Sequence, residues 1–231
     1  MRIDRFYLSE PVSGDIITVT DADVIHQWMR VFRMKKGSKL VVFDGSGAEY
    51  EAIIRTIQPE KAELDVAETR TVAPVEPAIT LAVALIKRDK FEWVLEKGTE
   101  LGVRQFVPLV ADRSDKKDIK MERAQKIVVE AAEQSGRGDV PDISEPTATG
   151  DFVSNIDTAN TYVLDLAGAP FHESVSKNTP ATFLIGPEGG WSDSERELFL
   201  NAGLQSITLG SQILKTETAA VSVAASVVLD K

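Results

Sequence analysis

Residues 182–195 read TFLIGPEGGWSDSE, and residues 207–220 read ITLGSQILKTETAA. In each stretch an apolar strand runs into a loop that contains glycine, and the loop leads into a helix. Glycine beside a strand end leaves backbone amides and carbonyls uncovered, so such a loop can approach a flat ligand closely. The alternative is a pair of tight turns that need glycine for conformational reasons and bind nothing.

The chain around these two stretches alternates strands and helices, which is typical of an α/β layer fold with a largely parallel sheet. Strands are expected at 79–86, 105–110, 162–166, 182–185 and 206–209, and helices at 89–101, 121–134, 193–202 and 217–229. Ser192 with Glu195, and Asp89 with Glu92, have the spacing of a capping box. Small residues dominate the last helix, which indicates a close packing partner within the chain or in a second subunit.

The first 70 residues follow a different pattern of short strands. These are expected at 3–8, 16–20, 39–43, 48–57 and 62–66, with a hairpin turn at 44–47 and one helix within 21–32 that Asp21 or Asp23 can cap. Residues 71–77 contain two prolines and no periodicity, and so predict an extended linker. We therefore expect a small, partly closed β-barrel domain at 1–72, a linker at 73–77 and an α/β domain at 78–231.

Composition narrows the class of protein. The 231 residues include no cysteine and two histidines, which excludes disulfides, a thiolate nucleophile and the common zinc sites. The uncharged run 218–229 is too short to span a membrane, and charged residues near the start disfavour a signal peptide, so we expect a soluble cytoplasmic protein without a metal. No glycine pattern of a Rossmann or P-loop site is present.

The net charge of −10 is unevenly distributed. Between Asp23 and Asp44 there is no acidic residue, whereas five cations fall in this segment, with Trp28 and Phe32 among them. Cations attract phosphates and exposed rings stack on unpaired bases, so the segment suits RNA. The alternative, which we favour for the two aromatic residues, is an amphipathic helix with a buried apolar face and a solvated basic rim.

Several motifs together resemble one family. The two C-terminal stretches are similar to the cofactor-site signature of the RsmE family, the 16S rRNA uridine-N3 methyltransferases of the SPOUT class. The same order of motifs extends upstream through 5–8, 26–33, 87–102, 113–114 and 133–137, and so covers nearly the whole chain.

The resemblance implies a fold and a cofactor. The fold would be a small N-terminal PUA-like β-barrel followed by a SPOUT α/β domain whose C-terminal segment forms a deep trefoil knot, an exception to the usual unknotted connections. The cofactor would be S-adenosyl-L-methionine, bound across a homodimer interface. The residues implied to hold it are Leu166, Leu184, Ile185, Gly186, Pro187, Glu188, Gly189, Gly190, Leu209, Gly210, Ile213, Leu214, Thr218 and Ala219.

The resemblance also implies a reaction, methylation of N3 of one uridine, number 1498 in the family's substrate, in 16S rRNA of the assembled 30S subunit. Because N3 carries a proton, a base or a stabilising cation is expected, and the matched motifs offer Glu188 and Glu217 as bases and Lys215 and Arg137 as cations. Lys215 stands where the family commonly has arginine, and it keeps the charge without the bidentate fork. RNA contacts are expected from Arg5, Arg30, Arg33, Lys35, Lys36, Lys39, Lys87 and Arg113. The alternatives are a knotted methyltransferase acting on another RNA and a non-catalytic RNA-binding protein associated with the ribosome.

Overall fold

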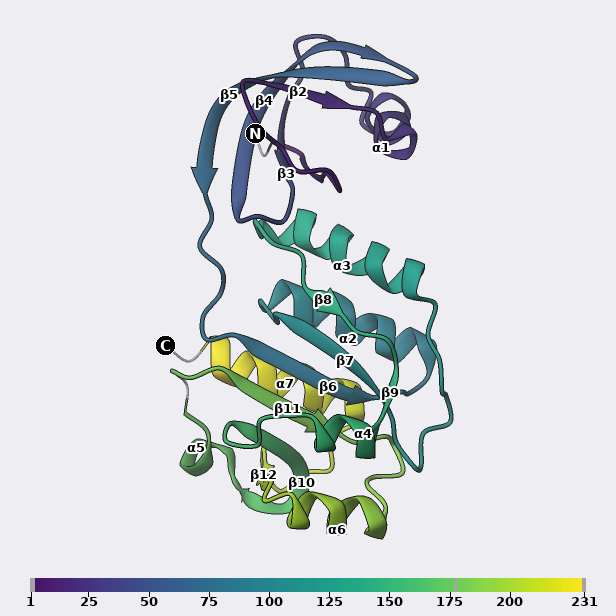
Figure 1. Cartoon of the computed structure of the whole chain (residues 1–231), viewed down its shortest axis with the longest axis vertical. Helices are drawn as coiled ribbons and strands as arrows, with labels where there is room; N and C mark the ends of the chain where they lie inside the picture. The colour runs from purple at the N-terminus through teal and green to yellow at the C-terminus, as the bar shows by residue number, and fades with distance from the viewer. Residues whose placement is uncertain (1–2, 177, 230–231) are drawn as a thin grey trace. The chain divides into compact units, whose positions relative to one another are not determined.

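The computed structural model describes residues 3–176 and 178–229 (Figure 1). The chain divides into two compact units, which are described separately below. The N-terminal unit contains the residues up to Pro74 together with Ala132–Val140, and the C-terminal unit contains Val75–Ala131 together with the residues from Pro141 onward. Within the described ranges, no helix has the length and apolar character needed to cross a bilayer.

The N-terminal unit is built on a five-stranded sheet. In spatial order its strands are β1 (Arg5–Tyr7), β3 (Lys39–Phe43), β4 (Ala48–Gln58), β5 (Lys61–Thr71) and β2 (Ile16–Val19). β1 and β3 are parallel and the other neighbours are antiparallel. The hairpin predicted between β3 and β4 is confirmed. This order leaves β1 and β2 as the two edges of the sheet.

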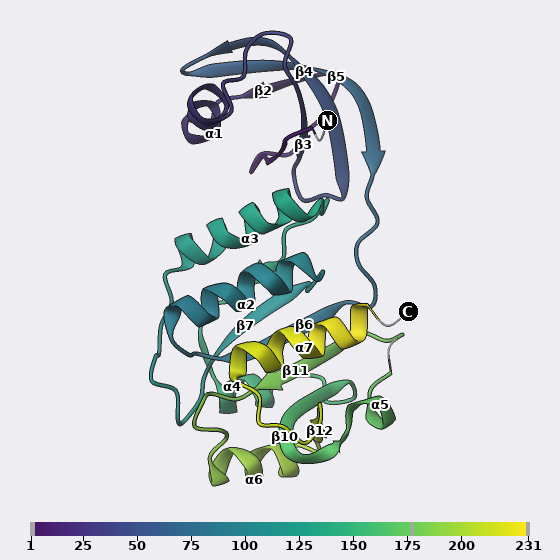
Figure 2. The same ribbon diagram turned by 180° about the vertical axis from the view of Figure 1, so that it is seen from behind.

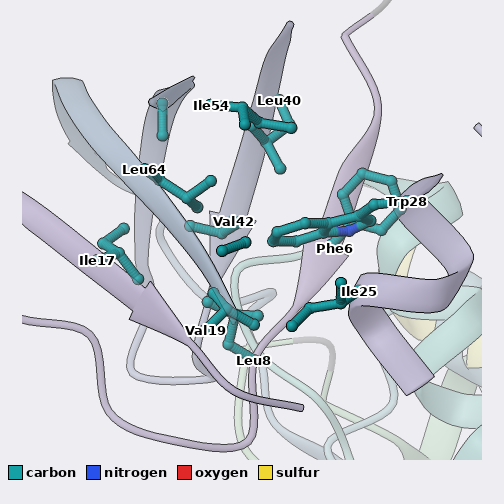
Figure 3. Packing of buried hydrophobic residues seen from close by; sticks show 12 residues of the cluster. Phe6, Leu8, Ile17, Val19, Ile25, Trp28, Leu40, Val42, Ile54 and Leu64 are labelled. Atoms are coloured by element: carbon teal, nitrogen blue, oxygen red, sulfur yellow. The ribbon is translucent and has the colours of Figure 1, made fainter. Parts of the chain in front are cut away.

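One hydrophobic core fills the concave side of this sheet. Figure 3 shows Trp28 and Phe6 lying together, with Ile25 reaching toward them from the helix. Trp28 and Ile25 are fully buried, and the rings of Phe6 and Trp28 meet edge to face with centroids 5.5 Å apart. The prediction that Trp28 is a buried core residue is therefore confirmed. Phe32 also contacts Phe6 edge to face, but 39% of its surface is exposed.

The single helix expected within 21–32 is two segments. α1 (Ala22–His26) is capped by Asp21, whose carboxylate accepts from the amides of Asp23 and Val24, and it continues as a π-helix, η1 (Gln27–Val31). Arg33 follows with a φ of 54°, a conformation that costs energy for any residue with a Cβ. The amide of Met34 then donates to the carbonyl of Trp28 over 2.8 Å, which ends the helix.

Residues 132–140 complete the N-terminal unit although they are distant in sequence. The amide of Tyr7 donates to the Glu133 carboxylate over 2.8 Å, and Arg5 Nη2 donates to the carbonyl of Arg137 over 2.8 Å. The amide of Gly47 donates to the carbonyl of Gly138. These bonds attach the segment to β1 and to the β3–β4 hairpin.

The C-terminal unit contains a parallel sheet, as the alternating pattern predicts. In spatial order its strands are β12 (Gln205–Thr208), β10 (Thr161–Pro170), β11 (Ala181–Ile185), β6 (Ile79–Ala84), β7 (Gln105–Val110) and β8 (Asp142–Ile143), and β9 (Thr147–Ala148) pairs with the end of β7. Every pairing in this sheet is parallel. The carboxyl ends of its strands therefore share one edge.

Helices cover both faces of the parallel sheet. α2 (Arg88–Glu100) and α7 (Thr216–Val228) lie side by side in Figures 1 and 2, and α7 also contacts β6 and β11. α4 (Thr149–Ser154) and α6 (Asp193–Asn201) pack on the other face, where Val153 and Phe199 join a core with Leu184 of β11. The remaining helices are α3 (Met121–Ser135) and the short α5 (Phe171–Ser174).

One predicted cap is wrong and one is confirmed. α2 begins after Lys87 without a side-chain cap, and Asp89 lies inside its first turn instead of at the N-cap; the Glu92 carboxylate is bonded to Arg88 and Arg123. In α6 both bonds of the capping box between Ser192 and Glu195 are present. A capping box requires its first residue to be the N-cap, so a helix that begins two residues earlier than predicted cannot use this pair.

Candidate functional site

A cleft opens beyond the ends of β11 and β12 and beside a bulge in β10, at the edge of the sheet where open α/β folds bind ligands. It consists of two adjoining cavities with volumes of about 440 and 960 Å³, including the space open to solvent. We call it the strand-end cleft. It is lined by Leu164, Asp165, Leu166, Ile185, Gly186, Pro187, Glu188, Gly190, Trp191, Arg196, Ile207, Thr208, Leu209, Gly210, Gln212, Ile213, Leu214, Lys215, Thr216 and Ala219.

A bulge in β10 shapes one wall of the cleft. Leu164 and Ala169 are both in register with Ile207 of β12, so residues 165–168 loop out between them. Gly168 makes this possible, since a Cβ at this position would collide with the backbone of Ile207. The bulge brings Asp165 and Leu166 into the cleft.

Trp191 supports the turn that follows β11. Its ring is 2% exposed, lies edge to face with Phe199, and donates through Nε1 to the carbonyl of Leu164 over 3.3 Å. A Cβ on Gly186 would come within 3.1 Å of this ring, so a larger residue would require the ring to shift by a few tenths of an ångström. Thr216 Oγ1 donates to the carbonyl of Gly186 over 2.8 Å, which ties the start of α7 to the same turn.

Four charged side chains line the cleft. Asp165 forms an ion pair with Arg196 of α6 and also accepts from the amide of Ala167 over 3.0 Å. The side chain of Asp165 is 10% exposed, whereas Glu188 and Lys215 are exposed and have no ion pair within the described part of the chain. The cleft is therefore lined by both cations and carboxylates, next to apolar side chains.

Most of the residues expected to hold a cofactor line this cleft. Those that do are Leu166, Ile185, Gly186, Pro187, Glu188, Gly190, Leu209, Gly210, Ile213, Leu214 and Ala219. Leu184 is instead fully buried in the core, Thr218 is exposed outside the lining, and the carbonyl of Gly189 accepts from Arg113. Sequence reasoning missed Asp165 and Arg196. An acid near the end of the otherwise apolar predicted strand 162–166 was the signal that could have indicated Asp165.

The four candidate catalytic residues fall into two groups. Lys215 and Glu188 line the strand-end cleft. Glu217 is 8% exposed, and its Oε1 lies 3.8 Å from Lys90 Nζ. Arg137 belongs to the N-terminal unit, where its buried guanidinium donates to both carboxylate oxygens of Asp139 over 2.9 and 2.8 Å.

The cations expected to contact RNA also differ in their surroundings. Arg30, Arg33, Lys35, Lys36 and Lys39 are exposed, and none pairs with an acid among the described residues. We call these five the basic segment. Arg5 is mostly buried, pairs with Glu49 and lies 5.2 Å from the centre of the Phe43 ring. Lys87 is exposed at the start of α2, and Arg113 is exposed with its Nη1 bonded to Gly189.

No cluster of three or more acidic or histidine side chains able to hold a metal ion occurs in residues 3–176 and 178–229.

Comparisons with known proteins agree over nearly the whole chain. A profile described as an RNA methyltransferase domain matches residues 74–228, and one described as an RNA methyltransferase PUA domain matches residues 29–67. The ribosomal RNA small subunit methyltransferase E of Synechocystis sp. is 35% identical over 91% of this chain and 72% of its own length. The protein of the same name from Rickettsia conorii is 30% identical over 98% of this chain and 96% of its own.

Solved structures give the same result. The ribosomal RNA small subunit methyltransferase E from Neisseria gonorrhoeae, bound to S-adenosyl methionine, superposes with a TM-score of 0.88 at 28% identity, covering 97% of this chain and 96% of that one. A Legionella pneumophila protein in complex with the bound cofactor SAM has a TM-score of 0.89 at 28% identity and covers 98% and 97%. The fold is therefore a PUA-like domain joined to a parallel-sheet α/β domain, and the chain belongs to the ribosomal RNA small subunit methyltransferase E family.

Proposed function

We propose that this protein transfers a methyl group from S-adenosyl-L-methionine to N3 of one uridine, number 1498, in the 16S rRNA of the assembled 30S subunit, and that it acts in the cytoplasm. The strand-end cleft is the observation that carries the proposal. It lies where the two glycine loops of the family signature meet, and relatives with the same fold were crystallised with this cofactor.

The cleft residues fit the chemistry of the cofactor. Leu166, Ile213, Leu214 and Ala219 supply apolar surface for a flat base, and the loop backbones supply hydrogen-bonding groups for its edge. The four charged side chains can meet the ribose hydroxyls, the amino group and the carboxylate. When bound, the cofactor would supply an electrophilic methyl group.

The residues of the chain would then prepare the uridine. Glu188 is an exposed carboxylate in the cleft and would accept the N3 proton, and Lys215 would stabilise the negative charge that then develops on the uracil. Glu217 and Arg137, each paired with another side chain, would support the fold around these groups. Because N3 lies on the Watson–Crick edge, the uridine must be unpaired or extruded when it reacts.

The remaining parts of the proposal concern RNA and assembly. The basic segment of the N-terminal unit would contact rRNA phosphates, with the functional division between RNA binding (1–72) and catalysis (78–231) falling in the linker at 73–77. We further propose that residues after β11 form a trefoil knot and that the protein acts as a homodimer. The small residues of α7 and the exposed Ile213 and Leu214 beside the cleft support this assembly.

Calorimetry and mass spectrometry test the proposal. Purified protein should bind S-adenosyl-L-methionine and methylate 30S subunits from a strain that lacks the endogenous enzyme, and mapping the modified nucleotide should locate the methyl group on N3 of the uridine. No cofactor binding would support the non-catalytic RNA-binding alternative. Binding with a methyl group on tRNA or another rRNA position would support a different knotted methyltransferase.

Two variants separate catalysis from binding. Glu188→Gln should lower kcat about a hundredfold and leave the Kd for S-adenosyl-L-methionine within about twofold, because glutamine has the same size and can still hydrogen-bond to the cofactor but cannot accept the N3 proton. Lys215→Arg should retain most of the activity that Lys215→Ala loses. An unchanged kcat in Glu188→Gln would exclude Glu188 as the base.

A further inference from the structure

The loop after β7 is bonded to the turn that lines the strand-end cleft. Glu195, in the first turn of α6, is 4% exposed, and its carboxylate accepts from two backbone amides. One is the amide of Ser192, at 2.9 Å, and the other is the amide of Asp112, at 3.1 Å. A buried carboxylate with both oxygens satisfied in this way joins the two segments firmly.

The side chain of Asp112 also bonds the loop after β7 to the start of α6. Its Oδ2 accepts from the hydroxyl of Ser192 over 2.5 Å and from that of Ser194 over 3.0 Å. These hydrogen bonds, first that from Ser192 and then that from Ser194, lower the pKa of Asp112 below its usual value because they stabilise the ionised carboxylate.

Arg113 completes the connection on the other side of the turn. Its Nη1 donates to the carbonyl of Gly189 over 2.9 Å, and its aliphatic carbons lie 3.4–4.0 Å from the position that a Cβ on Gly189 would occupy. The side chain therefore lies along the turn formed by residues 186–192. Five residues of that turn line the cleft: Gly186, Pro187, Glu188, Gly190 and Trp191.

We propose that Asp112, Arg113 and Glu195 are positioning residues that hold the turn 186–192 in the shape that accepts the cofactor. This inference rests on the proposed function. It assigns Arg113 to the protein's own turn, whereas the sequence indicated an RNA contact. The two roles differ in one measurable respect, since a positioning residue acts on cofactor binding before any RNA is present.

Isothermal titration of S-adenosyl-L-methionine into RNA-free protein tests the assignment. Arg113→Ala should raise the Kd about tenfold, and Arg113→Lys should recover part of the loss, because a lysine amine can still donate to the Gly189 carbonyl. Lys116→Ala is the matched control, since Lys116 is an exposed cation of the same loop outside the bonds described, and it should leave the Kd unchanged. In steady-state assays Arg113→Ala should raise KM for the cofactor more than it lowers kcat.

Hydrogen exchange provides a readout independent of ligand and activity. The amides of Asp112 and Ser192 should exchange slowly in the wild type and faster in Glu195→Gln, because an amide side chain cannot accept from both. If the wild type binds no cofactor, the proposed function fails. If the wild type binds and Arg113→Ala binds equally well, the positioning role is overturned, and weaker RNA binding by that variant with a smaller salt dependence would assign Arg113 to RNA.

Discussion

Gly168 determines the shape of the strand-end cleft more directly than any side chain in it. Its missing Cβ lets the β10 bulge pass against Ile207, and the bulge carries Asp165 into the cleft. Gly168→Ala should therefore lower the free energy of unfolding by about 2 kcal/mol and weaken cofactor binding about tenfold, as urea denaturation and calorimetry would show. Gly150→Ala is the matched control. That glycine lies in α4 with its nearest neighbour, Leu198, 4.0 Å from the added methyl group, so the change should be neutral or slightly stabilising.

Arg137 provides a second prediction at the scale of one residue. Its buried guanidinium donates to both carboxylate oxygens of Asp139, and Arg137→Ala removes these two charge-assisted hydrogen bonds. Arg137→Ala should lower the free energy of unfolding by about 3 kcal/mol and leave the cofactor Kd of the folded protein unchanged. Urea titrations monitored by circular dichroism would measure the change in stability, and calorimetry on the folded variant would measure the Kd. Normal stability combined with a lost kcat would restore Arg137 to the catalytic group.

Individual residues show why only part of the site could be predicted. Motif resemblance located the two glycine loops, because their side chains and spacing are local properties of the sequence. It could not show that Leu184 faces the core, or that Arg196 crosses from α6 to Asp165, because such contacts depend on how separate elements pack.

At the scale of elements, the length of each helix or strand determined whether it could be predicted from the sequence. The long apolar strands and amphipathic helices have clear periodicity, and the predicted bounds of β3 and β7 match the structure. β8, β9, α4 and α5 have two to six residues each, too few for a period to appear, and none was predicted. η1 was read as ordinary helix because a π-turn has no distinct pattern of residues.

The ion pairs of Glu92 join α2 to α3 and predict a pH dependence. Hydrogen bonds from Arg123, followed by those from Arg88, lower the pKa of Glu92 from 4.5 to about 2. A carboxylate whose pKa is depressed by folding stabilises the fold above its unfolded-state pKa and loses this contribution as the pH falls toward the folded-state value. Glu92→Gln should thus be less stable than the wild type by about 1 kcal/mol at pH 7, and the difference should shrink between pH 4.5 and pH 2. Urea unfolding at pH 7, 4 and 3 measures it, and a difference independent of pH would exclude ionisation as its source.

At the scale of the whole molecule, the distribution of charge matters more than its sum. The protein carries a net charge of −10, yet the basic segment carries five cations without a paired acid among the described residues. If it contacts rRNA phosphates, replacing Lys35, Lys36 and Lys39 by alanine should reduce the slope of log K against log salt concentration by about 2 to 3. Filter binding across a salt series measures the slope. Lys61→Ala is the control, because Lys61 is already paired with Glu63, and an equal effect of both changes would exclude a specific contact by the basic segment.

The attachment of residues 132–140 to the N-terminal sheet has a consequence for synthesis on the ribosome. Translation is vectorial, so the first 74 residues emerge before Glu133 and Arg137 have been synthesised. Until then the amide of Tyr7 cannot donate to the Glu133 carboxylate, and the guanidinium of Arg5 cannot donate to the carbonyl of Arg137. The nascent N-terminal unit can reach its final set of hydrogen bonds only after nearly sixty intervening residues, including β6, α2 and β7, have been made. A stalled chain ending at residue 74 should accordingly be more sensitive to protease than one extended to residue 140.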